Sequence, residues 1–405
     1  MEEWKEYRLG DVCSQLSDGL HKAPKFKLGG DYIFVNAKNI SNGFIVDNDL
    51  TKKSTHEEYL KYSSPLDDTS ILYSIDGTIG NVALYRGEKV ILGKGACYLN
   101  PMPNILDRFF LYYELLSPRF KAYIDKMSTG STIKHISLKT MRNYSFVAPP
   151  LQQQRQIACI LSSIDNKITC NRQINDNLEQ LAQTVLKNWK EQVKQRAHYS
   201  TKLETIALFV GGYSYKGKEL KPSKKAMATI KNFDRNGGFK LDGYKEIEPS
   251  DKVKPGQFVN MFDILVAHTD LTQNAEVIGN AEMVLSFDGY ERIVFSMDLV
   301  KVIPQDVFPF KFLLAALLRD SDFKSHCMGY VNGTTVLHMS KKALPEFEVL
   351  LPKDQSSICQ IDTYLSNIYR KMAEIVSESS HLSTLRDTLL PQLMSGELII
   401  NELTM

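Results

Sequence analysis

The chain has 405 residues, enough for two or more domains that each bury their own core. Its hydrophobic share of 43% and charged share of 24% are ordinary for a soluble globular protein. The formal net charge of +2 excludes a chain that is basic throughout, so any argument for a polyanionic partner must rest on local charge.

The sequence predicts neither a membrane span nor an export signal. The longest apolar run, at 310–318, is too short to cross a bilayer and predicts a core helix. The first residues are too polar for a signal peptide. Six scattered cysteines form no Cys-x-x-Cys pair, which favours a reduced, cytoplasmic protein over a disulfide framework or zinc site.

Residues 1–150 are expected to form the first globular domain. Short strand-like runs at 32–35 and 70–74 alternate with turn signals such as Asn42-Gly43. A more helical stretch follows at 108–127. Pro149-Pro150 then ends the domain, because consecutive prolines cannot continue a strand ladder or a helix interior.

Residues 151–198 are expected to form a long helix. Glycine and proline are absent from this segment, and its apolar residues recur at spacings of three and four. This pattern is typical of the seam between two helices. Asn171 and Asn175 interrupt the seam. A helix of about 35 residues would be roughly 50 Å long.

Residues 199–353 repeat the first globular segment. The run at 7–13 resembles that at 201–207, and Ile79-Gly-Asn resembles Ile278-Gly-Asn. The sequences between these islands differ strongly. Drift after duplication would explain this, and so would two frames that must match while their loops bind different targets.

Residues 354–405 are expected to form a second long helix and a tail. Both helices carry a 3-plus-3 step, at 175–178–181 and 379–382–385, which predicts a stammer in each heptad pattern. The predicted seam residues are Ile157, Leu161, Ile164, Ile168, Leu178, Leu181, Val185, Ile361, Leu365, Ile368, Met372, Ile375, Leu382, Leu385 and Leu389.

Two such stripes can cover each other if the helices pair antiparallel. The predicted fold class is therefore α+β, with two similar globular domains separated by a pair of long antiparallel coiled-coil helices in pseudo-two-fold symmetry. The alternative is that each helix packs only on its own domain, and the length of the stripes argues against it.

The longest repeated stretch, 128–168, returns at 331–372. Gly130, His135 and Ser137 correspond to Gly333, His338 and Ser340. Small hydroxyl residues after a glycine leave backbone N–H groups accessible to an anion such as phosphate, and histidine can donate to phosphate or to a base. The alternative is a turn whose histidine is hydrogen-bonded within the fold.

No catalytic motif is present in the sequence. There is no Gly-x-Gly-x-x-Gly, phosphate-binding loop or Gly-x-Ser-x-Gly motif. His326, Cys327 and His338 lack a second ligand pair at zinc-like spacing. We therefore expect neither a catalytic site nor a metal site in this chain.

The candidate binding surface is polar and lies in loops. The segment 213–254 contains eleven Lys and Arg residues but only six Asp and Glu residues, so it is locally basic. Such loops can neutralise phosphates and hydrogen-bond to base edges, although most charged loops are simply solvated. The candidate DNA-binding residues are Lys25, Lys27, Lys38, Asn39, Ser131, Thr132, Lys134, His135, Tyr215, Lys216, Lys218, Lys224, Lys231, Asn232, Thr334, Thr335 and His338.

The order and duplication of these segments resemble the specificity subunit of Type I restriction-modification systems. The similarity covers essentially the whole chain. The islands that carry it lie at 7–12, 71–80, 149–157 and 385–397. The second copy departs from the pattern at Lys353-Asp354 and at Ala267-His-Thr-Asp270.

The resemblance implies a non-catalytic DNA-binding subunit with two target-recognition domains. Each domain would read one half of a bipartite double-stranded DNA target, and the helices would set the half-site spacing. Two methyltransferase subunits using S-adenosylmethionine and restriction subunits using ATP and Mg²⁺ would carry out the chemistry. The chain itself would need no cofactor. A two-headed, non-catalytic adaptor that binds proteins is the alternative.

Overall fold

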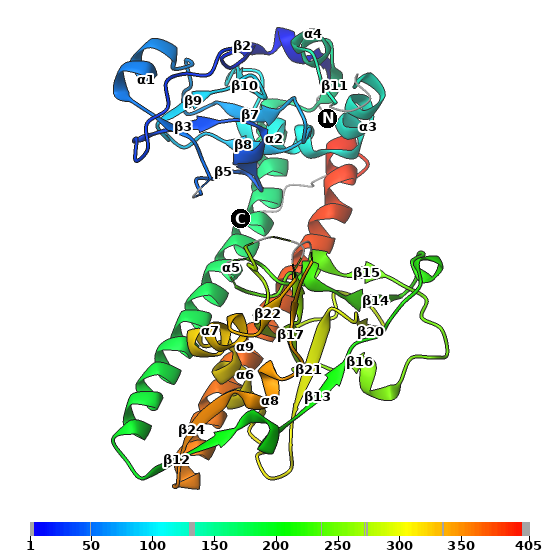
Figure 1. Ribbon diagram of the computed structural model, residues 1–405. Coiled ribbons are helices and arrows are strands. Elements are labelled where there is room, and N and C mark those ends of the chain that lie inside the picture. Colours follow the sequence, from blue (N-terminus) through cyan, green and yellow to red (C-terminus); the bar gives the residue numbers. More distant parts are fainter. Residues whose placement is uncertain are drawn as a thin grey trace. The chain divides into compact units, whose positions relative to one another are not determined.

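The computed structural model describes residues 4–48, 50–128, 134–235, 237–270, 272, 274–333 and 336–398. It divides into two compact units (Figure 1). The first unit comprises Met1–Lys167 and Leu382–Met405, and the second comprises Ile168–His381. Each unit thus includes part of both long helices.

The first unit is built on an antiparallel sheet in the order β2-β10-β7-β8. These strands are Cys13–Asp18, Ala96–Pro101, Ile71–Ser74 and Val82–Leu84. A second sheet has the order β6-β3-β9, with strands Lys53–Ser54, Tyr32–Val35 and Val90–Leu92. Strands β3 and β9 run parallel. Two further antiparallel pairs are β1–β11 (Lys5–Arg8 and Ser145–Ala148) and β4–β5 (Ile40–Ser41 and Phe44–Ile45).

The second unit repeats this plan. Its main antiparallel sheet has the order β13-β21-β17-β19, with strands Ala207–Gly211, Leu299–Pro304, Ile264–Ala267 and Ala281–Met283. The second sheet, β15-β14-β20-β16, comprises Lys245–Glu246, Lys225–Ala228, Arg292–Phe295 and Phe258–Val259, with β14 and β20 parallel. The pair β12–β24 joins His198–Lys202 to Glu348–Pro352. The duplication expected from the sequence is therefore present in the fold.

A third sheet in the second unit, β18-β23-β22, comprises Thr269–Asp270, Leu337–Met339 and Val331–Asn332. The corresponding place in the first unit holds an isolated bridge between Asp76 and His135. The two copies therefore differ in the loops around their conserved frames.

Short helices cover one side of each main sheet. In the first unit, α2 (Arg108–Leu116), α3 (Pro118–Met127) and α4 (Leu138–Arg142) contribute to the core, and α1 (His56–Tyr62) precedes β7. In the second unit, α6 (Lys311–Arg319), α7 (Ser321–Met328) and α8 (Ala343–Glu346) take the equivalent places. Helix α6 buries seven consecutive residues, which accounts for the uninterrupted apolar run in its sequence.

The two long helices are α5 (Leu151–Lys194) and α9 (Gln355–Ser395) (Figure 1). At 44 residues, α5 is roughly 66 Å long and exceeds the expected length. Neither helix, nor any other in the described part of the chain, is apolar enough over a sufficient length to cross a membrane.

The long helices pair antiparallel within each unit. In the first unit, Asp165 of α5 accepts a hydrogen bond from Arg386 of α9 at 2.9 Å. In the second unit, Asn171 donates to Glu378 at 2.8 Å, and Trp189 donates to Ser357 at 3.1 Å. The partner number falls as the α5 number rises, so the prediction of an antiparallel pair is confirmed.

The predicted stammer is wrong. Leu181 is 40% exposed and Leu385 is 47% exposed, so both lie outside the helix contact. Ala182, next to Leu181, is buried instead, and Arg386, next to Leu385, takes the inward position in the first unit. The inward positions continue at spacings of three and four, so Leu181 and Leu385 point outward.

The short 3₁₀ helices lie at the edges of both units. They are η1 (Leu9–Asp11), η2 (Ala37–Asn39), η3 (Leu203–Thr205), η4 (Gly217–Glu219), η5 (Ile230–Asn232), η6 (Leu241–Gly243) and η7 (Pro255–Gln257). Three of them, η2, η4 and η5, carry candidate DNA-binding lysines.

Candidate nucleic-acid interface

Helix η2 presents one lysine and buries one asparagine. The Asn36 side chain caps the helix by accepting from the Lys38 N–H at 3.0 Å. The Asn39 side chain accepts from the Asn36 N–H and donates to Val46 O and to Thr51 Oγ1, both at 3.1 Å. Asn39 is therefore a buried structural residue, whereas Lys38 is exposed.

The second unit repeats this arrangement in η5. The Asn232 side chain accepts from the Thr229 N–H at 2.8 Å and donates to Lys240 O at 2.7 Å. Asn232 is fully buried, and Lys231 is exposed. We therefore correct the sequence-based assignment and remove Asn39 and Asn232 from the candidate DNA contacts, because their amides are used within the fold.

Lys25 and Lys27 lie in a loop that is fixed to strand β6. The Lys27 N–H donates to Lys53 O at 2.9 Å, and Ser54 Oγ donates to Lys25 O at 2.6 Å. Both lysine side chains are exposed. Lys52, which the sequence analysis missed, places its ammonium group 4.9 Å from the centre of the Phe26 ring. An adjacent lysine pair, Lys52-Lys53, was the sequence signal available.

The basic loop of the second unit, residues 214–224, is organised around one carboxylate. Glu219 accepts from the Lys216 N–H at 2.7 Å, from the Tyr213 hydroxyl at 2.9 Å and from the Ser250 N–H at 3.2 Å. The hydrogen bond from the Lys216 backbone lowers the pKa of Glu219, so the carboxylate form is favoured. This anchor holds the loop while Lys216 and Lys218 remain exposed.

Other candidates in this unit differ in their availability. Lys224 forms an exposed ion pair with Glu291 at 3.2 Å. Tyr215 is partly buried against the small apolar cluster around Met227. Apart from Lys224, the remaining candidate lysines form no ion pair with another described residue: Lys25, Lys27, Lys38, Lys134, Lys216, Lys218 and Lys231. These seven ammonium groups are therefore free to contact an anion.

The sequence did not indicate the cations around Lys231. Lys231 lines a cavity of about 540 Å³ together with Arg235 and Lys240. Four carboxylates, Asp234, Asp242, Asp270 and Glu276, line the same cavity, and Arg235 pairs with Glu276 at 3.0 Å. The mixed charge makes this cavity a weaker anion site than the exposed loop 214–224.

The repeated histidines occupy comparable positions. His135 forms a hydrogen bond through Nδ1 to Asp76, and its backbone bridges the same residue. His338 is exposed on β23, where it pairs with Thr269 and Asn332. Ser131, Thr132, Thr334 and Thr335 lie outside the described residues. Within the described ranges, no cluster of His, Cys, Asp and Glu could hold a metal ion.

Comparison with known proteins finds similarity to one kind of subunit. Residues 1–180 match the family model described as "Type I restriction modification DNA specificity domain". The MjaIX specificity subunit of Methanocaldococcus jannaschii, a Type I restriction enzyme subunit, is 21% identical over 99% of this chain and 95% of its own length. The chain is therefore similar to Type I restriction-modification specificity subunits over almost its whole length.

Other Type I specificity subunits match over shorter stretches. The HindI specificity subunit of Haemophilus influenzae is 26% identical over 200 residues, 47% of this chain. The chain spans 41% of that protein and 39% of the MjaVIII specificity subunit of M. jannaschii.

One solved structure has a similar fold. A crystal structure of the Type I restriction-modification S subunit from M. genitalium superposes with a TM-score of 0.56 at 18% identity, covering 97% of this chain and 96% of that one. The family model covers residues 1–180, which include the sheets of the first unit and most of α5, and the main sheet of the second unit has the same strand order.

Proposed function

We propose that this chain is a Type I specificity subunit that recognises a bipartite double-stranded DNA target, with each globular domain, at 1–150 and 199–353, reading one half. The proposal rests on the observation that the same sheet framework occurs twice in the chain with different loops. The order of the main sheet is the same in both units, and the exposed lysines other than Lys38 and Lys231 lie where the two sequences diverge. A repeated frame with unlike basic loops suits two unlike half-sites.

We assign the candidate contacts to the loops that the frame holds rigid. Lys25, Lys27 and Lys38 would meet phosphates in one half-site, and Lys216, Lys218 and Lys231 would meet those in the other. Each loop is fixed by hydrogen bonds to a strand or a buried side chain. A fixed loop loses little conformational entropy on binding, which favours affinity and a defined register.

The paired helices would set the half-site spacing and dock two methyltransferase subunits. Several large apolar side chains on these helices face solvent: Ile174 and Leu181 on α5, and Tyr364 and Leu385 on α9. Exposed apolar residues along a helix suit contact with a partner helix. Catalysis would then reside in the methyltransferase subunits, which use S-adenosylmethionine, and in the ATP- and Mg²⁺-dependent restriction subunits.

Methylation sequencing tests this function. Cells that carry the methyltransferase subunits with this chain should show one bipartite methylated motif that is lost when the chain is deleted. If no motif disappears, the proposal is wrong. A protein-binding adaptor would instead leave duplex binding by the reconstituted complex insensitive to salt, whereas phosphate contacts require affinity to fall as salt rises.

A further inference from the structure

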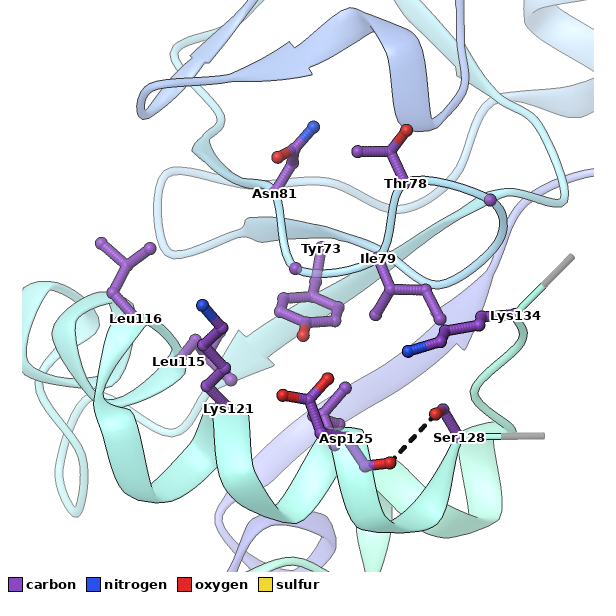
Figure 2. Close-up of a pocket in the computed structure, with 13 residues that line it drawn as sticks. Tyr73, Thr78, Ile79, Asn81, Leu115, Leu116, Lys121, Asp125, Ser128 and Lys134 are labelled. Carbon is purple, nitrogen blue, oxygen red and sulfur yellow. Dashed lines mark hydrogen bonds between the residues drawn. The ribbon is translucent and has the colours of Figure 1, made fainter. Parts of the chain in front are cut away.

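A pocket in the first unit is separate from the loops assigned above. It has a volume of about 510 Å³ and lies between the turn at 77–81 and helices α2 and α3 (Figure 2). Ile79, Leu115 and Ile124 form its apolar wall. Lys121, Asp125 and Lys134 provide its charged groups. Its size falls within the range of small-molecule sites, about 300–1,000 Å³.

A tyrosine hydroxyl group points into this pocket. The Tyr73 side chain is only 1% exposed, and Figure 2 shows its hydroxyl pointing toward Asp125. The hydroxyl forms no hydrogen bond with another described residue, so it is available to a ligand in the pocket. Burial raises the pKa of Tyr73, so the phenol keeps its proton and can donate it.

Two lysines in the pocket are also unpaired. Figure 2 shows the side chains of Lys121 and Lys134 directed toward the space in front of Tyr73. Neither forms an ion pair or a side-chain hydrogen bond with another described residue. Asp125 lies between them and leaves the charged lining with one excess positive charge.

In the second unit, the corresponding turn and helix pack against each other and leave a smaller space. Gly279 corresponds to Gly80, and Lys324 on α7 corresponds to Lys121 on α3. Lys324 donates to Glu276 O and to Asn280 Oδ1, both at 2.7 Å. A Cβ added to Gly279 would lie 2.8 Å from Cys327, so this turn packs directly on the helix. The space left is about 230 Å³.

We propose that the pocket of the first unit binds a nucleotide, with its phosphate held by Lys121 and Lys134. Two ammonium groups and a phenol provide donors to phosphate oxygens, the apolar wall can contact the sugar and base, and Asp125 can accept from a base amine. The nucleotide is either a unit of a DNA strand, which rests on the proposed function, or a free ligand, which does not.

Titration calorimetry of the full chain tests the pocket with deoxyadenosine 5′-monophosphate, deoxyadenosine and a short DNA duplex as probes. We expect Lys121→Gln to weaken binding of the monophosphate or the duplex by about tenfold or more, because a charge-assisted contact is lost. Tyr73→Phe should weaken it less while leaving the melting temperature unchanged or higher. Lys126→Gln on the same helix is the matched control and should change neither the binding affinity nor the melting temperature.

Competition between the monophosphate and the duplex shows whether the pocket binds DNA or a free nucleotide. If the duplex displaces the monophosphate, or binds where the monophosphate does not, the pocket serves DNA; if both bind together, it serves a free nucleotide. Binding of neither probe, or equal binding by wild type and both pocket variants, overturns the inference. Methylation of the bipartite motif is measured separately, and its persistence in Lys121→Gln would leave the proposed function intact.

Discussion

At the level of single residues, a polar side chain can contact DNA only if the fold does not already use it in an internal hydrogen bond or ion pair. The capping pairs Asn36 with Asn39 and Thr229 with Asn232 have cap and third-residue spacing, a signal that could have marked both asparagines as structural. Lys38 and Lys231 follow the caps and stay exposed. The two lysines named from the sequence are thus exposed, whereas the two asparagines named with them are buried structural residues.

The Arg319 cluster predicts a large effect on stability. Arg319 pairs with the buried Glu282 at 2.6 Å and with Glu179 at 2.8 Å. Arg319→Met would leave the buried Glu282 carboxyl group without its ion-pair partner, so we expect the free energy of unfolding to fall by about 3–5 kcal/mol in urea denaturation. Arg172→Met, an exposed change on α5, should alter it by less than about 0.5 kcal/mol. Equal effects of the two substitutions would contradict this interpretation.

Glu219 makes the order of the basic loop depend on pH. Because the pKa of Glu219 is lowered, the stability that its carboxylate gives the folded loop is complete above pH 4.5. That stability is lost as the pH falls through the lowered pKa. Glu219→Gln should therefore speed amide hydrogen exchange in 214–224 at neutral pH. Glu291→Gln removes only an exposed ion pair with Lys224 and should leave the exchange rates unchanged.

The phosphate lysines are expected to act without sequence preference. Lys216→Gln and Lys218→Gln should each weaken binding of all duplexes alike and reduce the slope of affinity against salt by about one. The measurement is duplex affinity of the reconstituted complex at several salt concentrations. A variant that relaxes the preference at one base position instead identifies a base contact.

At the level of elements, the long helices were predictable and their detailed register was not. Hydrophobic spacing identified α5 and α9 because both carry an apolar stripe. The stripe alone did not separate leucines that face the other helix from those that face outward. Leu161 is fully buried, whereas Leu181 is 40% exposed. Two kinds of leucine contact were therefore merged into one predicted seam.

This difference gives a matched pair of substitutions. Leu161→Ala should lower the free energy of unfolding by about 2–5 kcal/mol, because it leaves a cavity in the first unit. Leu181→Ala should cost less than about 1 kcal/mol but weaken binding of a methyltransferase subunit, as measured by calorimetry. Loss of stability without loss of partner binding in Leu181→Ala would place this leucine inside the fold.

At the level of the whole chain, the duplication was visible in the sequence because its longest repeated stretch contains a single one-residue insertion. The fold class followed from that repeat and the two helical stripes. The domain boundaries at 150, 198 and 353 remain a prediction, since each compact unit includes parts of α5 and α9. The unequal pockets could not be predicted, because their volumes depend on how Gly80 and Gly279 approach neighbouring side chains.

If each globular domain reads one half of the target, a domain exchange followed by methylation sequencing should change one half-site only. Residues 199–353 would be replaced by the corresponding domain of a Type I specificity subunit, with residues 1–150 and both long helices left unchanged. We expect one half of the methylated motif to change while the other half and the spacing persist. A change in both halves, or an unchanged motif from a folded and methylating complex, would contradict it.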